Sequence, residues 1–214
     1  RADLTAVMEA RRELSDWEGA TFNPANADGI AKYQGKNALQ AHDALLGDLD
    51  QRVSSIRSRL SPEQQQRFDQ VSFSFRDSVQ GRLNSYADRE YSAYEATERK
   101  ATIDNIGQDA VSAGMSGDFG LADVRLQEAV GIASAAYQTQ GLGAEAIKAS
   151  ARGIVSSVRK QTATAMATRD PFAAEDYYHR YADQMTPEDR AQVERTLYPV
   201  VKDRAAYEMA NALA

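Results

Sequence analysis

The stretch between Ser61 and Ala113 restricts the fold most, because its pattern is typical of one uninterrupted helix. It opens Ser61-Pro62-Glu63-Gln64, where a serine N-cap, a proline at the first helical position and a glutamine together form a capping box. Apolar residues then recur in steps of three and four, or sums of these. They are Phe68, Val71, Phe75, Val79, Leu83, Tyr86, Tyr94, Ile106 and Ala110. At about 1.5 Å per residue, such a helix is on the order of 75–80 Å long.

One short segment of this stretch is ambiguous. Val71-Ser72-Phe73-Ser74-Phe75 alternates between apolar and polar residues, as a β-strand does. Its flanks are strongly helical, and no hairpin turn or partner strand accompanies it. We therefore predict helix through this segment as well.

Composition limits the class of protein. The 214 residues are 43% hydrophobic, enough for one large domain or two small ones. The net charge of −6 comes from 25 basic and 31 acidic residues mixed along the chain, so we expect no specific nucleic-acid binding. The lack of cysteine excludes disulfides, thiolate metal sites and cysteine nucleophiles, and leaves the compartment open. No apolar run is long enough to span a membrane.

The first third of the chain reads as two helices separated by an irregular segment. The first helix is expected at 2–18, with a buried face made of Leu4, Val7, Met8, Leu14 and Trp17. Residues 19–35 are rich in turn-forming asparagine, glycine and proline. Trp17, Phe22 and Tyr33 are expected to anchor this segment onto neighbouring helices, the alternative being a loop that binds a partner. A second helix, from Gly35 to Leu60, then pairs antiparallel with the long helix.

The last hundred residues read as further helical hairpins. Helices are expected from Asp118, over 145–168, from Asp170 and from Thr186. The first of these is expected to bury Leu121, Leu126, Val130, Ile132 and Tyr137. Pro199 falls inside the final helix and should kink it or cost about 3 kcal/mol. The chain begins with Arg1 and has no helix stop at its end, so we expect both ends to continue into a longer protein.

These patterns predict an all-α fold: an elongated array of antiparallel helical hairpins organised around one very long helix at about 61–113. The expected domains are residues 1–113, with the irregular loop and the long helix, and residues 114–214, with the stacked hairpins. One continuous domain is the alternative.

No motif for chemistry emerges. His42 and His179 lack the spacing of a zinc site, and no Glu-x-x-His, Gly-x-Ser-x-Gly or phosphate-binding glycine loop occurs. Carboxylates lie among arginines and lysines, as on solvated helix faces. We therefore predict no catalytic, cofactor-binding or metal-binding residue. The aromatic residues Phe172, Tyr177, Tyr178 and Tyr181 have helical spacing, which is more typical of a core or an interface than of a ligand cage.

Several features occur in an order that suggests a family. A first helix ends in Trp17 and leads through an Asn/Gly-rich loop to Gly35-Lys36-Asn37-Ala38. Leu-Ser-Pro-Glu-Gln-Gln-Gln-Arg-Phe follows at 60–68, then a long polar helix. Arg-Asp-Pro-Phe-Ala-Ala-Glu-Asp-Tyr-Tyr occurs at 169–178 and Met-Thr-Pro-Glu-Asp at 185–189. In these features the chain resembles the helical region of large phage and prophage virion proteins. These are internal or DNA-ejection proteins that often carry a lytic transglycosylase domain elsewhere.

The resemblance implies a structural role. The transglycosylase's catalytic Glu-Ser pair and its Gly-Leu-Met-Gln-like and Ala-Tyr-Asn-like strings do not occur here, so no catalytic residue is carried over. In the family, such regions pack inside the capsid or tail and help to form the conduit for DNA. The resemblance thus implies a virion location, with delivery to the host periplasm. The bacterial cytoplasm is the alternative.

We therefore expect a non-enzymatic assembly segment that packs, through apolar stripes on its helices, against copies of itself or other virion proteins, as a homo-oligomer. The residues expected at this surface are Trp17, Phe22, Tyr33, Tyr91, Tyr177 and Tyr178. A bacterial helical-repeat adaptor that binds peptides in a groove formed by residues 145–214 is the alternative. An enzyme with an unrecognised helical active site is a third possibility.

Overall fold

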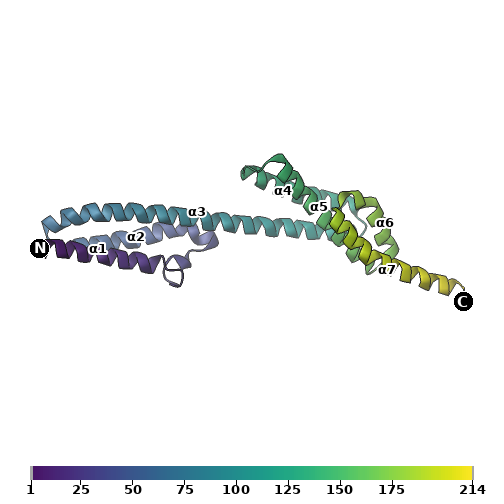
Figure 1. Ribbon diagram of the computed structural model, residues 1–214, viewed down its shortest axis with the longest axis horizontal. Coiled ribbons are helices and arrows are strands. Elements are labelled where there is room, and N and C mark those ends of the chain that lie inside the picture. The colour runs from purple at the N-terminus through teal and green to yellow at the C-terminus, as the bar shows by residue number, and fades with distance from the viewer. Residues whose placement is uncertain (1, 214) are drawn as a thin grey trace. The chain divides into compact units, whose positions relative to one another are not determined.

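The computed structural model describes residues 2–213, and every element in that range is a helix, which confirms the expected all-α class (Figure 1). The elements are α1 (Ala2–Thr21), η1 (Ile30–Lys32), η2 (Gly35–Asn37), α2 (Ala38–Arg57), α3 (Pro62–Met115), α4 (Phe119–Thr139), α5 (Ala144–Ala167), α6 (Pro171–Tyr181), η3 (Ala182–Gln184) and α7 (Pro187–Ala212). Among these described helices, none combines the length and apolar character that crossing a membrane requires.

The long helix is confirmed. Helix α3 has 54 residues and includes the ambiguous segment at 71–75. Its first turn is held by the expected capping box: the backbone N–H of Ser61 donates to Gln64 Oε1 at 2.9 Å, and the N–H of Gln64 donates to Ser61 Oγ at 3.5 Å.

The chain divides into two compact units, and the division falls within α3. Unit 1 ends at Thr97 and unit 2 begins at Glu98. This division groups residues by their mutual contacts and does not test where independently folding domains begin and end. The predicted domain boundary after residue 113 therefore stays a prediction.

Unit 1 is built from α1, α2 and the first part of α3. Helices α1 and α2 are joined by the irregular segment, and α2 turns tightly into α3, so neighbours along the chain run antiparallel (Figure 1). Their apolar stripes meet in one core, in which Leu14, Leu49, Phe68 and Leu83 are completely buried. Burial of such side chains supplies the main driving force for this arrangement.

Two residues of the expected α1 face are not buried. Leu4 is 56% exposed and Met8 is 63% exposed, whereas Val7, Ala10, Leu14 and Trp17 are buried. The buried residues follow steps of three and four. Leu4 and Met8 lie roughly 100° and 140° around the helix axis from the middle of that stripe. The prediction was wrong at these two positions because apolar side chains that lie outside the stripe were assigned to it.

Paired charges reinforce the register between α2 and α3. Arg76 donates to both carboxylate oxygens of Asp50, at 2.7 and 3.0 Å, and Arg57 does the same to Asp69, at 2.8 and 3.1 Å. These hydrogen bonds lower the pKa of both aspartates. Because the pairs are solvent-exposed, they add little to the free energy of unfolding. Their main effect is to favour one alignment of α2 along α3.

The irregular segment is anchored as the sequence predicted. Trp17 belongs to the core of unit 1, and Phe22 and Tyr33 pack against it. The Tyr86 hydroxyl donates to the Ile30 carbonyl at 3.2 Å. Gly29 lies so close to the end of α1 that a Cβ there would be 2.4 Å from the carbonyl oxygen of Thr21, so this position requires glycine.

Unit 2 is organised around α5, which packs against α4, α6 and α7. The end of α3 also approaches α5 closely, since a Cβ at Gly114 would be 2.7 Å from Thr162 Cγ2. Asp118, Asp170 and Thr186 cap α4, α6 and α7 through their side chains, as the sequence indicated.

Of the five residues predicted to be buried on α4, only Leu126 is buried, and Val130, Ile132 and Tyr137 are half-buried. Leu121 is 45% exposed, and the buried positions are Ala122, Leu126, Ala129 and Ala133. Leu121 lies roughly 110° from the middle of this stripe, which consists mainly of small residues. The prediction assigned leucine to the buried face in preference to alanine. In the structure, alanines occupy that face, and their small side chains allow α4 to lie close to the neighbouring helix.

Candidate functional site

Most of the residues expected at a partner surface are packed within the chain. Trp17 is 6% exposed, and its Nε1–H donates to Asp48 Oδ2 at 2.5 Å. Tyr177 and Tyr178 are 2% and 8% exposed. Phe22 and Tyr33 cover the core of unit 1, and Tyr91 is half-buried with its ring centroid 6.2 Å from that of Tyr94. The structure brings these six residues to no common surface within either unit, and their binding role stays a prediction.

A buried arginine occupies the centre of unit 2. Arg159 is 3% exposed, and its guanidinium lies 3.8 Å from the centroid of the Tyr181 ring. It donates to Gln184 Oε1 at 3.0 Å and to the Tyr177 hydroxyl at 3.2 Å, and it pairs with Asp123. Burial works to lower the pKa of Arg159, but its hydrogen bonds to Asp123 and Tyr177 outweigh burial and raise this pKa.

This arginine joins α4, α5, α6 and η3 rather than presenting a free charge. A cavity of about 420 Å³ lies beside it, lined in part by Asp123 and Gln184. Each of the three guanidinium nitrogens has a protein partner, so the charge is already compensated. Sequence reasoning missed this residue. The available signal was its position four residues after Val155 and four before Ala163, on the apolar side of α5.

A second polar cluster fixes the start of α7 to α5. Ser156 is completely buried, accepts a hydrogen bond from the Thr186 N–H at 2.8 Å and donates to Asp189. Lys160 Nζ lies 2.7 Å from Asp189 Oδ1. Although serine, lysine and aspartate also occur together in catalytic sites, this hydroxyl is inaccessible and fully engaged. The cluster therefore acts as an extended cap of α7.

Asp189 is expected to make stability depend on pH. Burial would raise its pKa, but hydrogen bonds from Lys160 and Ser156 outweigh that effect and lower it. A lowered native pKa stabilises the fold at pH values above the unfolded-state value of about 3.9, and this stabilisation is lost as the pH falls through the native pKa. Asp189→Asn should lower the free energy of unfolding by about 1–2 kcal/mol at pH 7. In urea titrations, the difference from wild type should shrink below about pH 4.

The matched control is Asp203→Asn, which removes the same charge from an exposed position on the same helix. It should change stability by less than about 0.5 kcal/mol. A deficit of Asp189→Asn that stayed constant from neutral to acidic pH would contradict the role of its charge.

The histidines and acidic residues form no metal site among the described residues, because no three of them gather closely enough to bind an ion. His179 is exposed, and His42 Nδ1 lies 2.8 Å from Asp43 Oδ1 on the surface.

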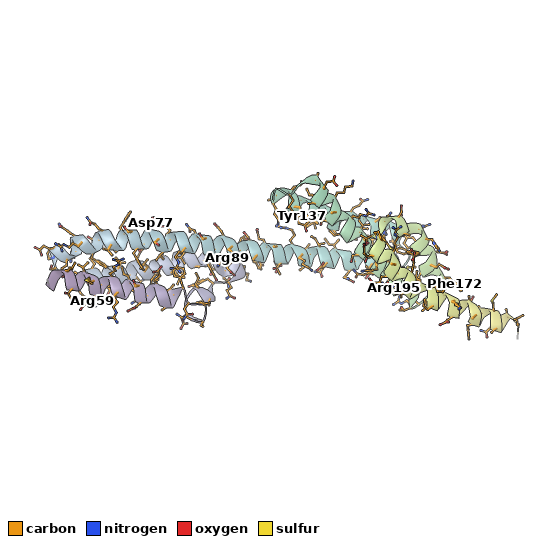
Figure 2. The ribbon with its side chains drawn as sticks, viewed as in Figure 1. Arg59, Asp77, Arg89, Tyr137, Phe172 and Arg195 are labelled. Carbon is orange, nitrogen blue, oxygen red and sulfur yellow. The ribbon has the colours of Figure 1, made fainter. Side chains whose placement is uncertain are left out.

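A groove between α6 and α7 is the clearest candidate for binding within unit 2. It has a volume of about 720 Å³ and is lined by Glu175, Tyr178, His179, Ala191, Glu194, Arg195, Leu197, Tyr198 and Pro199. Tyr178 donates its hydroxyl to Glu194, and burial together with this carboxylate raises the pKa of Tyr178 to about 12. Pro199 has no N–H, so the carbonyl of Arg195 lacks its usual helical donor. Arg195 is labelled in Figure 2.

A largely exposed apolar stripe, in which Val201 and Ala205 are partly covered, continues from this groove along α7. We call Tyr198, Val201, Ala205 and Met209 the α7 stripe; they are three or four residues apart and share one face. Tyr198 is 74% exposed and Met209 is 69% exposed. Among the described residues after Val201, only Ala205 is partly covered. Val200 still packs against the core of unit 2, but residues 202–212 have almost no packing against other described elements.

No protein-family model, curated protein or solved structure matches this chain.

Proposed function

We propose that this chain is a structural assembly segment that associates with copies of itself through the second half of α7. One observation carries the proposal: residues 202–212, about three helical turns, continue an apolar stripe and are almost entirely exposed in the part of the chain that the structure describes. Short helices are marginal in water without tertiary packing. A partner that covers Tyr198, Val201 and Met209 would bury apolar area and stabilise this segment.

The proposal places the segment in an internal, tail or DNA-ejection component of a phage or prophage particle. The support for this part is the sequence resemblance described above. The stacked helices of unit 2 and the long helix α3 are compatible with such a component. The proposed mechanism is helix packing, and it assigns no catalytic step to these residues.

Association should depend on the α7 stripe. In sedimentation velocity, the wild-type protein is expected to shift from monomer to oligomer as its concentration increases. Met209→Glu places a charge in the stripe and should weaken association at least about tenfold, because a charge buried in an apolar contact must be desolvated. Met8→Glu is the matched control, since Met8 is 63% exposed and lies in unit 1. Equal effects of the two substitutions would contradict the proposal.

A helical adaptor that binds peptides remains the second candidate, and the α6–α7 groove favours it. This groove lies within the part of the chain expected to form the adaptor's binding surface, and it combines Tyr178 and Leu197 with polar groups at its edge. The two functions differ in sedimentation: an adaptor stays monomeric until a peptide is added, whereas the assembly segment associates alone.

A further inference from the structure

Unit 1 contains a groove that the proposed function does not use. It has a volume of about 590 Å³ and lies between the segment after α1 and one face of α3. Phe22, Pro24 and Ile30 form the side that belongs to the irregular segment. Ser78, Arg82, Ser85 and Arg89 contribute from α3, with Tyr86 and Gly81 between them.

The charged side chains that line this groove are both arginines, although Glu18, just outside the lining, forms an ion pair with Arg82. Arg82 and Arg89 line it, and no carboxylate does. This is notable in a chain with a net charge of −6. An anionic group would be attracted to these arginines, whereas most of the surface of this acidic chain would repel it.

Arg82 is held in place by the groove itself. Its guanidinium lies 3.9 Å from the centroid of the Phe22 ring, and Nη1 donates to Glu18. Nε and Nη2 donate to no described residue, so one side of a fixed guanidinium keeps free donors. A donor that is already oriented loses little conformational entropy when it binds.

Arg89 is exposed and has no compensating charge. Its guanidinium lies 5.7 Å from the centroid of the Tyr86 ring, and it forms no hydrogen bond or ion pair with any described residue. Figure 2 labels it on α3. Arg82 and Arg89 are seven residues apart, so they share a helix face at a separation of roughly 10 Å.

The surface beside the two arginines permits close approach, because Gly81 lies next to Arg82 on α3. Gly81 has no side chain, and a Cβ at this position would meet nothing within 4 Å. The Ser85 hydroxyl is already engaged by the Gly81 carbonyl at 3.0 Å. The apolar rings of Phe22 and Tyr86 lie beside this gap. A partner that matches this surface therefore offers apolar contact beside Phe22 and Tyr86, a negative charge opposite Arg89 and a hydrogen-bond acceptor opposite the free donors of Arg82.

We propose that this groove binds an acidic helical segment of a protein partner, with two carboxylates seven positions apart and an apolar side chain between them. Carboxylates match arginine through charge-assisted hydrogen bonds. A nucleic acid is the less suitable occupant, because two arginines provide too few phosphate contacts. The inference goes beyond the proposed function, because every lining residue belongs to unit 1 and none to α7.

Fluorescence anisotropy tests this proposal. The probe is a labelled alanine-based helical peptide of about 15 residues, with two glutamates seven positions apart and leucines between them. A peptide with glutamines at the same two positions is its neutral control. Wild-type protein should bind the acidic peptide at least about tenfold more tightly than the neutral one, with an affinity that falls as salt rises. Arg89→Gln should weaken binding of the acidic peptide about tenfold.

The matched variant is Arg67→Gln, which removes the same charge from an exposed position on α3 outside the groove and should bind as the wild type does. Met209→Glu protein should also bind the acidic peptide with wild-type affinity. A failure of the proposed self-association can therefore be distinguished from a failure of this inference. Equal affinity for the acidic and neutral peptides would overturn the inference, as would equal losses in Arg67→Gln and Arg89→Gln. Tighter binding of a single-stranded oligonucleotide, or full displacement of the peptide by millimolar phosphate, would also overturn it.

Discussion

Replacing Phe68 with alanine is expected to lower the free energy of unfolding by about 4 kcal/mol, because it leaves a cavity in the core of unit 1. The Phe68 side chain is 0% exposed and belongs to the cluster in which α1, α2 and α3 meet. The loss should appear as a lower urea midpoint in far-UV circular dichroism.

The control comes from the same helix and the same residue type. Phe73 lies five residues later and is 75% exposed. Phe73→Ala should change the free energy of unfolding by no more than about 0.5 kcal/mol. If the two substitutions cost the same, the face of α3 assigned to the core would be wrong.

Arg159→Ala is expected to destabilise unit 2 by about 3 kcal/mol, which combines lost packing with lost polar contacts. The substitution removes the hydrogen bonds to Gln184 and Tyr177 and the stacking on Tyr181. Asp123 is half-exposed, so water can solvate it once the arginine is gone, and this limits the cost. The same urea titration measures the change.

Arg152 provides the comparison for this arginine. It is an exposed residue on the same helix, so Arg152→Ala tests the loss of charge and helix-surface contact alone. Its expected effect is below about 0.5 kcal/mol. A small effect of Arg159→Ala, similar to that of Arg152→Ala, would show that the buried arginine does not hold α4, α5 and α6 together.

The helices and their starts could be predicted because local chemistry determines them. Ser61 with Gln64, Asp118, Asp170 and Thr186 are capping residues whose side chains bond to backbone N–H groups within three positions. The long helix follows from a periodic pattern that no proline interrupts. Such signals need no knowledge of the tertiary structure.

Which side chains are buried was harder to predict. Leu4, Met8 and Leu121 are apolar but lie outside the buried stripes, and only the position of a neighbouring helix determines which apolar side chains are buried. Arg159 is the opposite case, a charged residue that is buried. Its hydrogen-bond partners lie between 18 and 36 residues away in the sequence, so no local pattern reveals them. Both grooves depend on the packing of separate elements. For these reasons, periodicity and composition did not identify the residues that line either groove.

Amide hydrogen exchange of α7 at low and high protein concentration tests the central claim most directly. Residues 203–212 are expected to exchange rapidly in dilute solution, because all of them except the partly covered Ala205 are exposed among the described residues. Their exchange should slow at least about tenfold at high concentration, while exchange of the buried α5 residues Val158, Arg159, Thr162 and Ala163 should not change. Exchange in residues 203–212 that is the same at every concentration would contradict assembly through the second half of α7.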